Sequence, residues 1–434
     1  MMNIDSVITT KILIVLFALN INITHAQHKE DLKSLKYEFS KMSLPEVQLD
    51  FENILNPQLN HEDLDKQLLH IKQILLSSEA LETKNYCELV EYEKIRFDLK
   101  THQVRLELLQ HRAHNIKPYI GSIYPLNDAK KWYQLLTLWW LGEDISPVEL
   151  KSIGEQEFQL AHKQLTLIEK SEKDKKISSA NSQSIRNAYQ QTEVTLKQHL
   201  YKIFPKQWSF KPVNIERSNL GSSFSVPGFY NLESETFFYN PLEEDYNLSQ
   251  VDWLYIHEAV PGHHYQNKMV EKYGICNQQL STGSEMAFTE GWAAYTETLG
   301  KELGLFQDPN SYYFALKWQA LRAMRVIIDV GIHAQGWSVS QAESYWLKHF
   351  PEGKDVMHRE IERIQKWPMQ VNTYVFGKYK IEQLKAQLKK QQGDMFNEVI
   401  FHKNIVSLSQ LPLSSINYYT QIFTNKKPGA TNEK

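Results

Sequence analysis

The chain has 434 residues, of which 42% are hydrophobic and 23% charged, and its formal net charge is −3. This composition is ordinary for a globular protein with a sizeable core, so it excludes a disordered chain, and it gives no indication of nucleic-acid binding. Cys87 and Cys276 are the two cysteines. One disulfide is possible in an oxidising compartment, but the pairing does not follow from the sequence.

The first 26 residues are typical of an export signal. Lys11 precedes an apolar run over residues 12–23, and Thr24-His25-Ala26 places small residues at a suitable cleavage site. The run is short for a membrane span, and no cysteine follows it to carry a lipid. We therefore expect cleavage after Ala26, a periplasmic or secreted protein, and no integral membrane segment after signal removal.

Helical periodicity dominates the mature chain. Leu, Glu and Lys recur at spacings of three and four from about residue 29 to 110, which predicts amphipathic helices in a bundle. A further helix is predicted over 132–141, and another begins at Ser146-Pro147 with a good cap and an acidic first turn. Residues 170–184 are polar and lack apolar periodicity, which predicts an exposed loop.

Between residues 204 and 241 aromatic and β-branched residues alternate with Pro, Gly and Asn, which predicts short antiparallel strands at 224–226, 229–230 and 236–239. The predicted fold class is mainly α. A single large helical domain spans 27–425, with a small antiparallel sheet beside the helix that contains residues 257–264, and residues 426–434 form a disordered tail. An edge strand of such a sheet could pair with an extended peptide.

The stretch from His257 to His264 contains three imidazoles and a carboxylate. In the usual helical zinc motif, H-E-x-x-H, two His at i and i+4 share a face and the Glu assists the metal-bound water. Here Pro261 occupies the i+4 position. Because its ring would clash with the carbonyl of His257, a regular helix must kink or bulge there, and Gly262 makes the distortion easy.

The distortion decides which histidine is the second ligand. An ideal helix would place His264 about 20° from His257, whereas a bulge favours His263. We predict His257 and His263 as ligands, with His264 as an alternative second ligand or a group on the substrate side. Sites with two His usually take a Glu from the following helix, and Glu290, in the helix predicted over 282–297, is the predicted third ligand.

The pattern His-Glu-Ala-x-Pro-Gly-His-His-x-Gln at 257–266, followed by Glu-Gly-Trp-Ala-x-Tyr-x-Glu at 290–297, resembles the bacterial domain-of-unknown-function family 885. That family is itself similar to the gluzincin metallopeptidases, which include thimet oligopeptidase and angiotensin-converting enzyme. The resemblance continues at 145–154, 325–337, 363–378 and 401–413, and it implies a gluzincin-like metallopeptidase. One departure is Met369, where the family usually has Gly, and the chain is short for the family.

A polar stripe crosses the apolar segment 321–333 and predicts a wall of the active site. It consists of Arg322, Arg325, Asp329 and His333 at steps of three and four residues. We expect His333 and Tyr374 to stabilise the oxyanion, and Arg325 to bind a substrate carboxylate. The other predicted substrate-binding residues are Arg322, Gln370 and Tyr239.

These residues predict an exported zinc-dependent hydrolase, most simply a peptidase that cleaves short peptides. Zn2+ held by three protein ligands lowers the pKa of water to about 7, and Glu258 can then accept its proton as general base. One alternative is a zinc amidohydrolase that acts on non-peptide amides or N-acyl amino acids. Another is a helical protein that binds metal or peptide without turnover, although Glu258, His333 and Tyr374 together argue against it. Endo- and exopeptidase activity are not distinguished.

Overall fold

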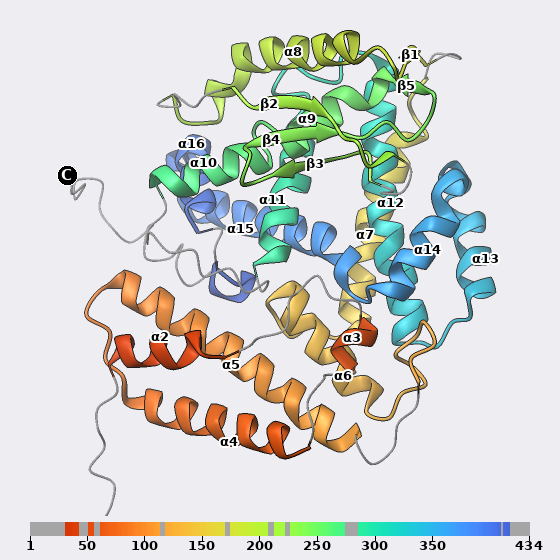
Figure 1. Cartoon of the computed structure of the whole chain (residues 1–434). Helices are drawn as coiled ribbons and strands as arrows, with labels where there is room; N and C mark the ends of the chain where they lie inside the picture. The colour runs from red at the N-terminus through yellow and green to blue at the C-terminus, as the bar shows by residue number, and fades with distance from the viewer. Residues whose placement is uncertain are drawn as a thin grey trace, which may run out of the picture.

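The computed structural model describes residues 31–42, 51–55, 61–112, 118–169, 174–206, 212–221, 226–273, 285–408 and 411–416. The predicted signal at 1–26, the predicted tail at 426–434 and Cys276 lie outside these residues. The described chain is mainly helical with small sheets, as the sequence predicts (Figure 1).

The N-terminal helices form one layer, drawn in red to yellow at the bottom of Figure 1. They are α2 (Leu32–Ser40), α3 (Phe51–Leu55), α4 (His61–Ser77), α5 (Tyr86–Arg112) and α6 (Ala129–Leu136). Leu64, Leu68 and Ile71 of α4 are buried at helical spacing, and Ile95 and Leu99 of α5 are fully buried. The predicted amphipathic bundle is therefore confirmed for the described part of 29–110.

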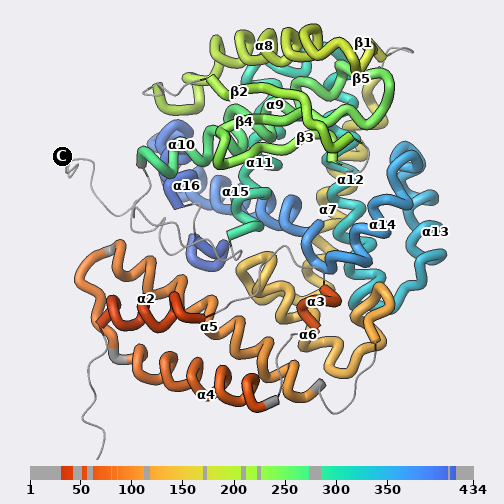
Figure 2. The backbone as a smooth tube through the Cα atoms, viewed as in Figure 1, coloured from red at the N-terminus to blue at the C-terminus, as the bar shows by residue number. Residues whose placement is uncertain are grey.

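Two long helices, α7 (Pro147–Leu165) and α12 (Pro309–His333), run side by side through the centre of the molecule (Figure 2). The predicted start of α7 is confirmed, because Ser146 caps it and Pro147 occupies its first position. A Cβ on Gly154 would lie 2.9 Å from the Val326 side chain, so the two helices pack closely at this point. Every residue of α12 from Ala320 to His333 is buried, including its charged residues.

A second close crossing joins α11 (Met286–Thr298) and α15 (Thr373–Gln392). A Cβ on Gly291 would lie 2.3 Å from the Gly377 Cα, and a Cβ on Gly377 would lie 1.8 Å from the Ala287 carbonyl oxygen. The two backbones therefore touch without side chains between them. Nearby, His402 of α16 (Glu398–Val406) is fully buried, with Nε2 2.8 Å from the Tyr295 hydroxyl of α11 and Nδ1 2.6 Å from the Ile203 carbonyl.

The larger sheet has the strand order β2 (Asn214–Arg217), β4 (Thr236–Tyr239) and β3 (Gly228–Asn231). The antiparallel pair β3 and β4 confirms two of the predicted strands, while residues 224 and 225 lie outside the described chain. β2 joins β4 in parallel, an arrangement that the local sequence did not indicate. β3 is an edge strand of this sheet.

The prediction of an exposed loop over 170–184 is wrong for much of its described part. β1 (Lys176–Ser178) pairs antiparallel with β5 (Asp245–Asn247), and α8 (Ser182–His199) begins directly afterwards, capped by Asn181. A strand of three residues shows no recognisable periodicity, and it forms here because a distant segment supplies its hydrogen bonds.

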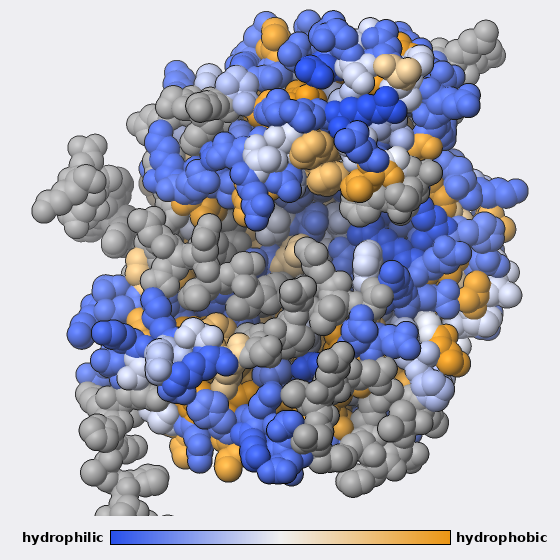
Figure 3. Space-filling view, in the orientation of Figure 1, coloured by the Kyte–Doolittle hydropathy of each residue, from blue (hydrophilic) through white to orange (hydrophobic). Residues whose placement is uncertain are grey.

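The remaining helices are α9 (Val251–Glu258), α10 (His263–Tyr273), α13 (Val339–His349) and α14 (Met357–Lys366). α13 and α14 lie together at one side of the molecule (Figures 1 and 2). Figure 3 shows a mainly hydrophilic face on which apolar residues are scattered. Within the described ranges, no helix combines the length and apolar character that crossing a membrane requires.

Candidate metal centre

The predicted metal helix is interrupted between its two histidines. α9 ends at Glu258 and α10 begins at His263, and residues 259–262 between them contain a cis peptide bond from Val260 to Pro261. The expected kink or bulge within one helix is therefore a break between two helices. A Cβ on Gly262 would lie 1.7 Å from the His257 carbonyl oxygen, so the chain can return this closely only because residue 262 is glycine.

The break brings three predicted ligands together from three helices. His257 Nε2 of α9 lies 3.6 Å from Glu290 Oε2, and His263 Nε2 of α10 lies 3.5 Å from the same oxygen. One candidate ligand atom from each of these residues lies within 4.8 Å of the others. His264 is not part of this cluster, since its Nδ1 lies 3.0 Å from the Tyr230 hydroxyl on β3.

The unsatisfied atoms of the cluster fit a bound cation. Glu290 Oε2, which both imidazoles approach, is buried and has no hydrogen-bond partner among the described residues, and the same is true of His263 Nδ1. A buried carboxylate oxygen without a hydrogen bond is costly, and a cation at this position would satisfy it. Two imidazole nitrogens and one carboxylate oxygen are a ligand set that suits zinc.

The charges around His257 also favour a cation. Burial and the nearby Arg322 lower the pKa of His257, but contacts with Glu290, Glu297 and Glu258 outweigh them and raise it to about 9. Burial raises the pKa of Glu290, whereas its contacts with His257 and His263 lower it well below the ordinary value. The carboxylates therefore stabilise a positive charge at the two histidines. Protons on the imidazoles or a bound metal ion can supply that charge.

Glu297 orients the His257 ring. Its Oε1 accepts a hydrogen bond from His257 Nδ1 at 2.7 Å, and it also forms an ion pair with Arg322. This contact leaves His257 Nε2 as the nitrogen that faces Glu290. The sequence analysis assigned no role to Glu297, although its position offered a signal: it follows Glu290 by seven residues, which is two turns along the same face of α11.

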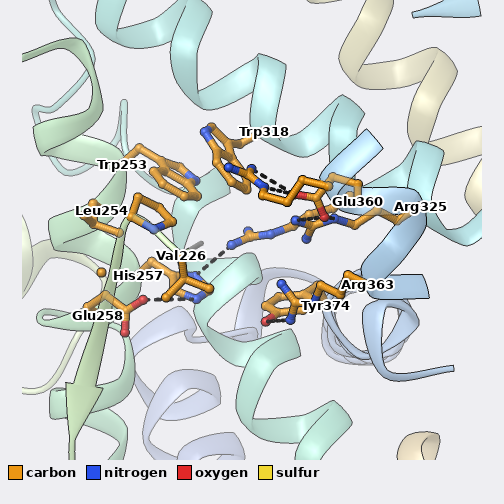
Figure 4. Close-up of a pocket in the computed structure, with 14 residues that line it drawn as sticks. Val226, Trp253, Leu254, His257, Glu258, Trp318, Arg325, Glu360, Arg363 and Tyr374 are labelled. Atoms are coloured by element: carbon orange, nitrogen blue, oxygen red, sulfur yellow. Dashed lines mark hydrogen bonds and ion pairs between the residues drawn. The ribbon is translucent and has the colours of Figure 1, made fainter. Parts of the chain in front are cut away.

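A pocket adjoins His257 and Glu258 (Figure 4). Its walls come from the start of β3 and from α9, α12, α14 and α15. His257 and Glu258 lie on one side of the pocket, Arg363 and Tyr374 lie opposite, and Trp253 and Trp318 form an aromatic wall between them. The two tryptophan rings stack with centroids 4.6 Å apart. The complete lining consists of Val226, Pro227, Gly228, Trp253, Leu254, His257, Glu258, Trp318, Arg322, Arg325, Arg359, Glu360, Arg363 and Tyr374.

Tyr374 and both predicted arginines line the pocket, but each arginine already forms an ion pair with a carboxylate of the protein. Arg325, expected to bind a substrate carboxylate, donates from Nε and Nη2 to Glu360 Oε2 at 2.7 and 2.6 Å. Arg322 is paired with Glu297. The sequence analysis gave no role to Glu360 or to Arg363, because no local motif connects α14 with the histidines.

A tight turn precedes Gln370 and Tyr374, of which Tyr374 lines the pocket, whereas Gln370 does not and instead accepts a hydrogen bond from Arg363 Nη2 at 2.8 Å. Met369 precedes them with a φ of 73°, in the left-handed region where the family usually has Gly. Its backbone N–H donates to Asp329 Oδ2 at 2.7 Å, so a buried carboxylate supports this conformation. The turn therefore keeps the shape that Gly favours although a larger residue occupies it.

Two predicted site residues lie elsewhere. His333 is fully buried, with Nε2 donating to the Ile364 carbonyl at 3.0 Å and Nδ1 accepting from the Ile123 N–H at 3.4 Å. Tyr239 is buried in β4, where its hydroxyl lies 3.5 Å from the Ser182 carbonyl. Neither residue lines the pocket, so the structure does not bring them to the histidine cluster.

This chain is thus a mainly helical protein in which a His/His/Glu cluster borders an arginine-rich pocket. The family described as "Bacterial protein of unknown function (DUF885)" matches residues 99–417, and the chain belongs to that family. No curated protein matches the sequence.

Two solved structures resemble the fold. The "putative lipoprotein from Colwellia psychrerythraea" is 19% identical, with a TM-score of 0.62 over 91% of this chain and 70% of that one. A "putative lipoprotein of unknown function from Shewanella oneidensis" is 16% identical, with a TM-score of 0.52 over 90% of this chain and 77% of that one. At these identities the similarity concerns the fold alone.

Proposed function

We propose that this protein is an exported zinc-dependent hydrolase and, within that class, a peptidase that cleaves short peptides. The observation that carries the proposal is the cluster of His257, His263 and Glu290, whose ligand atoms lie within 4.8 Å of one another beside Glu258. Export is supported by the apolar run at residues 12–23 and by the description of both solved relatives as lipoproteins.

The residues divide into those that would hold zinc and those that would move protons. His257, His263 and Glu290 would hold the ion, which, when bound, polarises an amide carbonyl and acidifies water. Glu258 is buried on the pocket wall, with Oε1 3.9 Å from His257 Nε2. From this position it accepts the proton of the attacking water and delivers it to the leaving nitrogen.

Tyr374 supplies a hydrogen-bond donor on the opposite side. Its ring stacks on that of His257 with centroids 6.2 Å apart. Burial, reinforced by the charge of Glu290, raises the pKa of Tyr374 above its ordinary value. Because the hydroxyl stays protonated, it can donate to the negative charge that develops on the substrate carbonyl oxygen.

The position of β3 favours a peptide over a small amide. β3 is an edge strand, and Gly228 at its beginning lines the pocket together with the preceding Val226 and Pro227. An extended peptide could therefore pair with this edge while its scissile bond lies at the histidine cluster. A small N-acyl amino acid would gain nothing from such an edge.

The test combines metal analysis with a peptide library. We expect the purified protein to contain about one zinc per chain and to cleave a mixed peptide library, with cleavage lost after chelation and restored by zinc. Glu258→Gln is the matched variant, since it keeps the three ligands. Cleavage of N-acyl amino acids but not of peptides would point to an amidohydrolase, and zinc binding without any cleavage would point to a binding protein.

A further inference from the structure

Arg363 is the pocket arginine whose charge no carboxylate neutralises at ion-pair distance within the described ranges. Its Nη2 donates to Gln370 Oε1 at 2.8 Å and lies 3.5 Å from the Tyr374 hydroxyl. Its Nε is buried and has no hydrogen-bond partner among the residues that the structure describes. The contacts of Arg363 are thus with neutral groups, although its guanidinium lines the pocket.

The other pocket arginines differ in this respect. Arg325 and Arg359 both donate to Glu360, and Arg322 is paired with Glu297. With Glu258 assigned to the metal side, the arginine side of the pocket keeps an excess of positive charge. Arg363 is half-buried at the pocket wall, and a ligand that brings a carboxylate would give its guanidinium the ion-pair partner that the neighbouring arginines already have.

Arg363 also lies at a useful distance from the histidine cluster. The Tyr374 side chain connects the two, because its ring stacks on His257 at 6.2 Å and its hydroxyl approaches Arg363 at 3.5 Å. Figure 4 shows Arg363 and Tyr374 across the pocket from His257 and Glu258. A few residues of extended chain, at about 3.5 Å each, can cover such a span.

We propose that Arg363, held in place by its contacts with Gln370 and Tyr374, binds the free α-carboxylate of a peptide substrate, so that the enzyme removes residues from the C-terminus. This inference rests on the proposed peptidase function and specifies its substrate class. Planar recognition of a carboxylate suits a guanidinium whose position is fixed by neighbouring hydrogen bonds. It replaces Arg325 as the predicted carboxylate-binding residue, because Arg325 already pairs with Glu360.

The carboxylate of an Asp or Glu side chain has the same chemistry, so the test must separate the two sources. The α-carboxylate is favoured because it is part of the backbone itself and lies near the scissile bond when the chain ends at Arg363. At this end of the pocket Arg359 and Arg325 already share Glu360 as their partner.

The binding test uses the zinc-loaded Glu258→Gln protein, and the metal-free protein in parallel, with N-acetylated hexapeptides in three forms: the free acid, the C-terminal amide, and an amide whose last residue is Glu. Calorimetry should show the free acid binding about 10- to 100-fold more tightly than either amide. Arg363→Gln should remove this preference, and Arg363→Lys should restore part of it. Arg359→Gln is the matched control, because it removes a paired charge from the same pocket and should keep the preference.

The outcomes separate this inference from the proposed function. Equal binding of acid and amide by the protein with Arg363 intact would overturn the inference, whether or not Arg363→Gln folds, and so would equal binding of the Glu-containing amide. In the cleavage assay, products shortened from the C-terminus support the inference, whereas efficient internal cleavage of amidated peptides contradicts it and leaves the peptidase proposal intact. Acid-selective binding without cleavage of any peptide would sink the peptidase proposal and keep the carboxylate site.

Discussion

Glu297 accepts a hydrogen bond from His257 Nδ1 at 2.7 Å, and the same carboxylate forms an ion pair with Arg322. The positive charge of Arg322 therefore lies behind the histidine cluster, and the Glu297 carboxylate between Arg322 and His257 neutralises it. Glu297 thus has two effects on a cation in front of His257: it fixes the ring, and it screens Arg322.

Replacing Glu297 by Gln should weaken zinc binding about 10- to 100-fold while leaving all three ligands in place. Gln can still contact the ring but no longer neutralises Arg322. Competition against a chromophoric chelator measures the change. Glu302→Gln is the control, because Glu302 is exposed just beyond the end of α11 and should bind zinc like the unmodified protein. Unchanged affinity in Glu297→Gln would show that the contact is only structural.

The two adjacent histidines should behave differently. We expect His263→Ala to purify without metal, because His263 Nε2 lies 3.5 Å from Glu290 Oε2. His264→Ala should keep its metal and lose part of its activity, since His264 contacts Tyr230 instead. Metal content per chain, measured by atomic emission, decides between them, and the reverse pattern would make His264 the ligand.

Replacing Glu258 by Gln should preserve both fold and zinc content but reduce peptide hydrolysis by about 100-fold or more. The amide cannot accept a proton from water, although it occupies the same space. Turnover should be measured at equal zinc occupancy, with circular dichroism confirming the fold. Hydrolysis at the unmodified rate would exclude Glu258 as the general base.

The sequence was sufficient to predict that His257, Glu258, His263 and Glu290 lie together. The proline after Glu258 must distort the helix, which favours His263 as the second ligand, and the following helix offers the carboxylate of Glu290. The sequence could not place the polar stripe of α12. Arg322 and His333 share a helix face, but the eleven-residue step from one to the other corresponds to roughly 16 Å along the axis. Arg322 therefore lines the pocket, whereas His333 contacts the backbone near Ile123 and Ile364.

Glu360, the carboxylate that pairs with Arg325, was equally inaccessible to sequence reasoning. Glu360 lies on α14, and its contact with Arg325 depends on how α14 packs against α12. Periodicity indicates which face of a helix is buried, but it does not indicate which partner that face meets. For the same reason β1 was missed, since its pairing with β5 is a long-range contact.

The buried His402 should make stability depend on pH. Burial lowers its pKa to about 4 from an ordinary value of 6.5, so between these two pH values the unfolded chain binds a proton that the folded chain does not. Unfolding free energy should therefore rise with pH across this window and fall on acidification, with a full effect of about 3 kcal/mol.

The variant His402→Gln isolates this contribution. It should be less stable than the unmodified protein at pH 7, because the contacts with Tyr295 and Ile203 are altered. The slope of its unfolding free energy against pH should nevertheless be smaller between pH 6.5 and 4. The reduction corresponds to the uptake of up to one proton on unfolding. Urea titrations at several pH values provide both numbers, and parallel pH profiles would show that His402 is not the responsible group.

The helix crossing predicts that Gly377→Ala is destabilising. In an open helix this change would stabilise by about 1 kcal/mol, but here the new Cβ would meet the Ala287 carbonyl oxygen at 1.8 Å. Separating two packed backbones should cost about 3 kcal/mol or more. Gly393→Ala tests backbone strain without a clash: nothing lies within 4 Å of its Cβ, and its φ of 54° with a ψ of −129° should cost about 1 to 3 kcal/mol. Urea unfolding compares the two variants.

The same crossing bears on how the protein could acquire new substrates. Gly291 directly follows the metal-ligand candidate Glu290, and Gly377 lies one turn beyond Tyr374, so the place where α11 and α15 touch sets the spacing of these two side chains. Because the two backbones touch directly, no side chain lies between them whose replacement could change that spacing in small steps. The walls contributed by β3 and α14 have no such restriction. Divergence in substrate range among related chains should therefore concentrate around Val226 and Arg359, while the half that holds Glu290 and Tyr374 stays invariant.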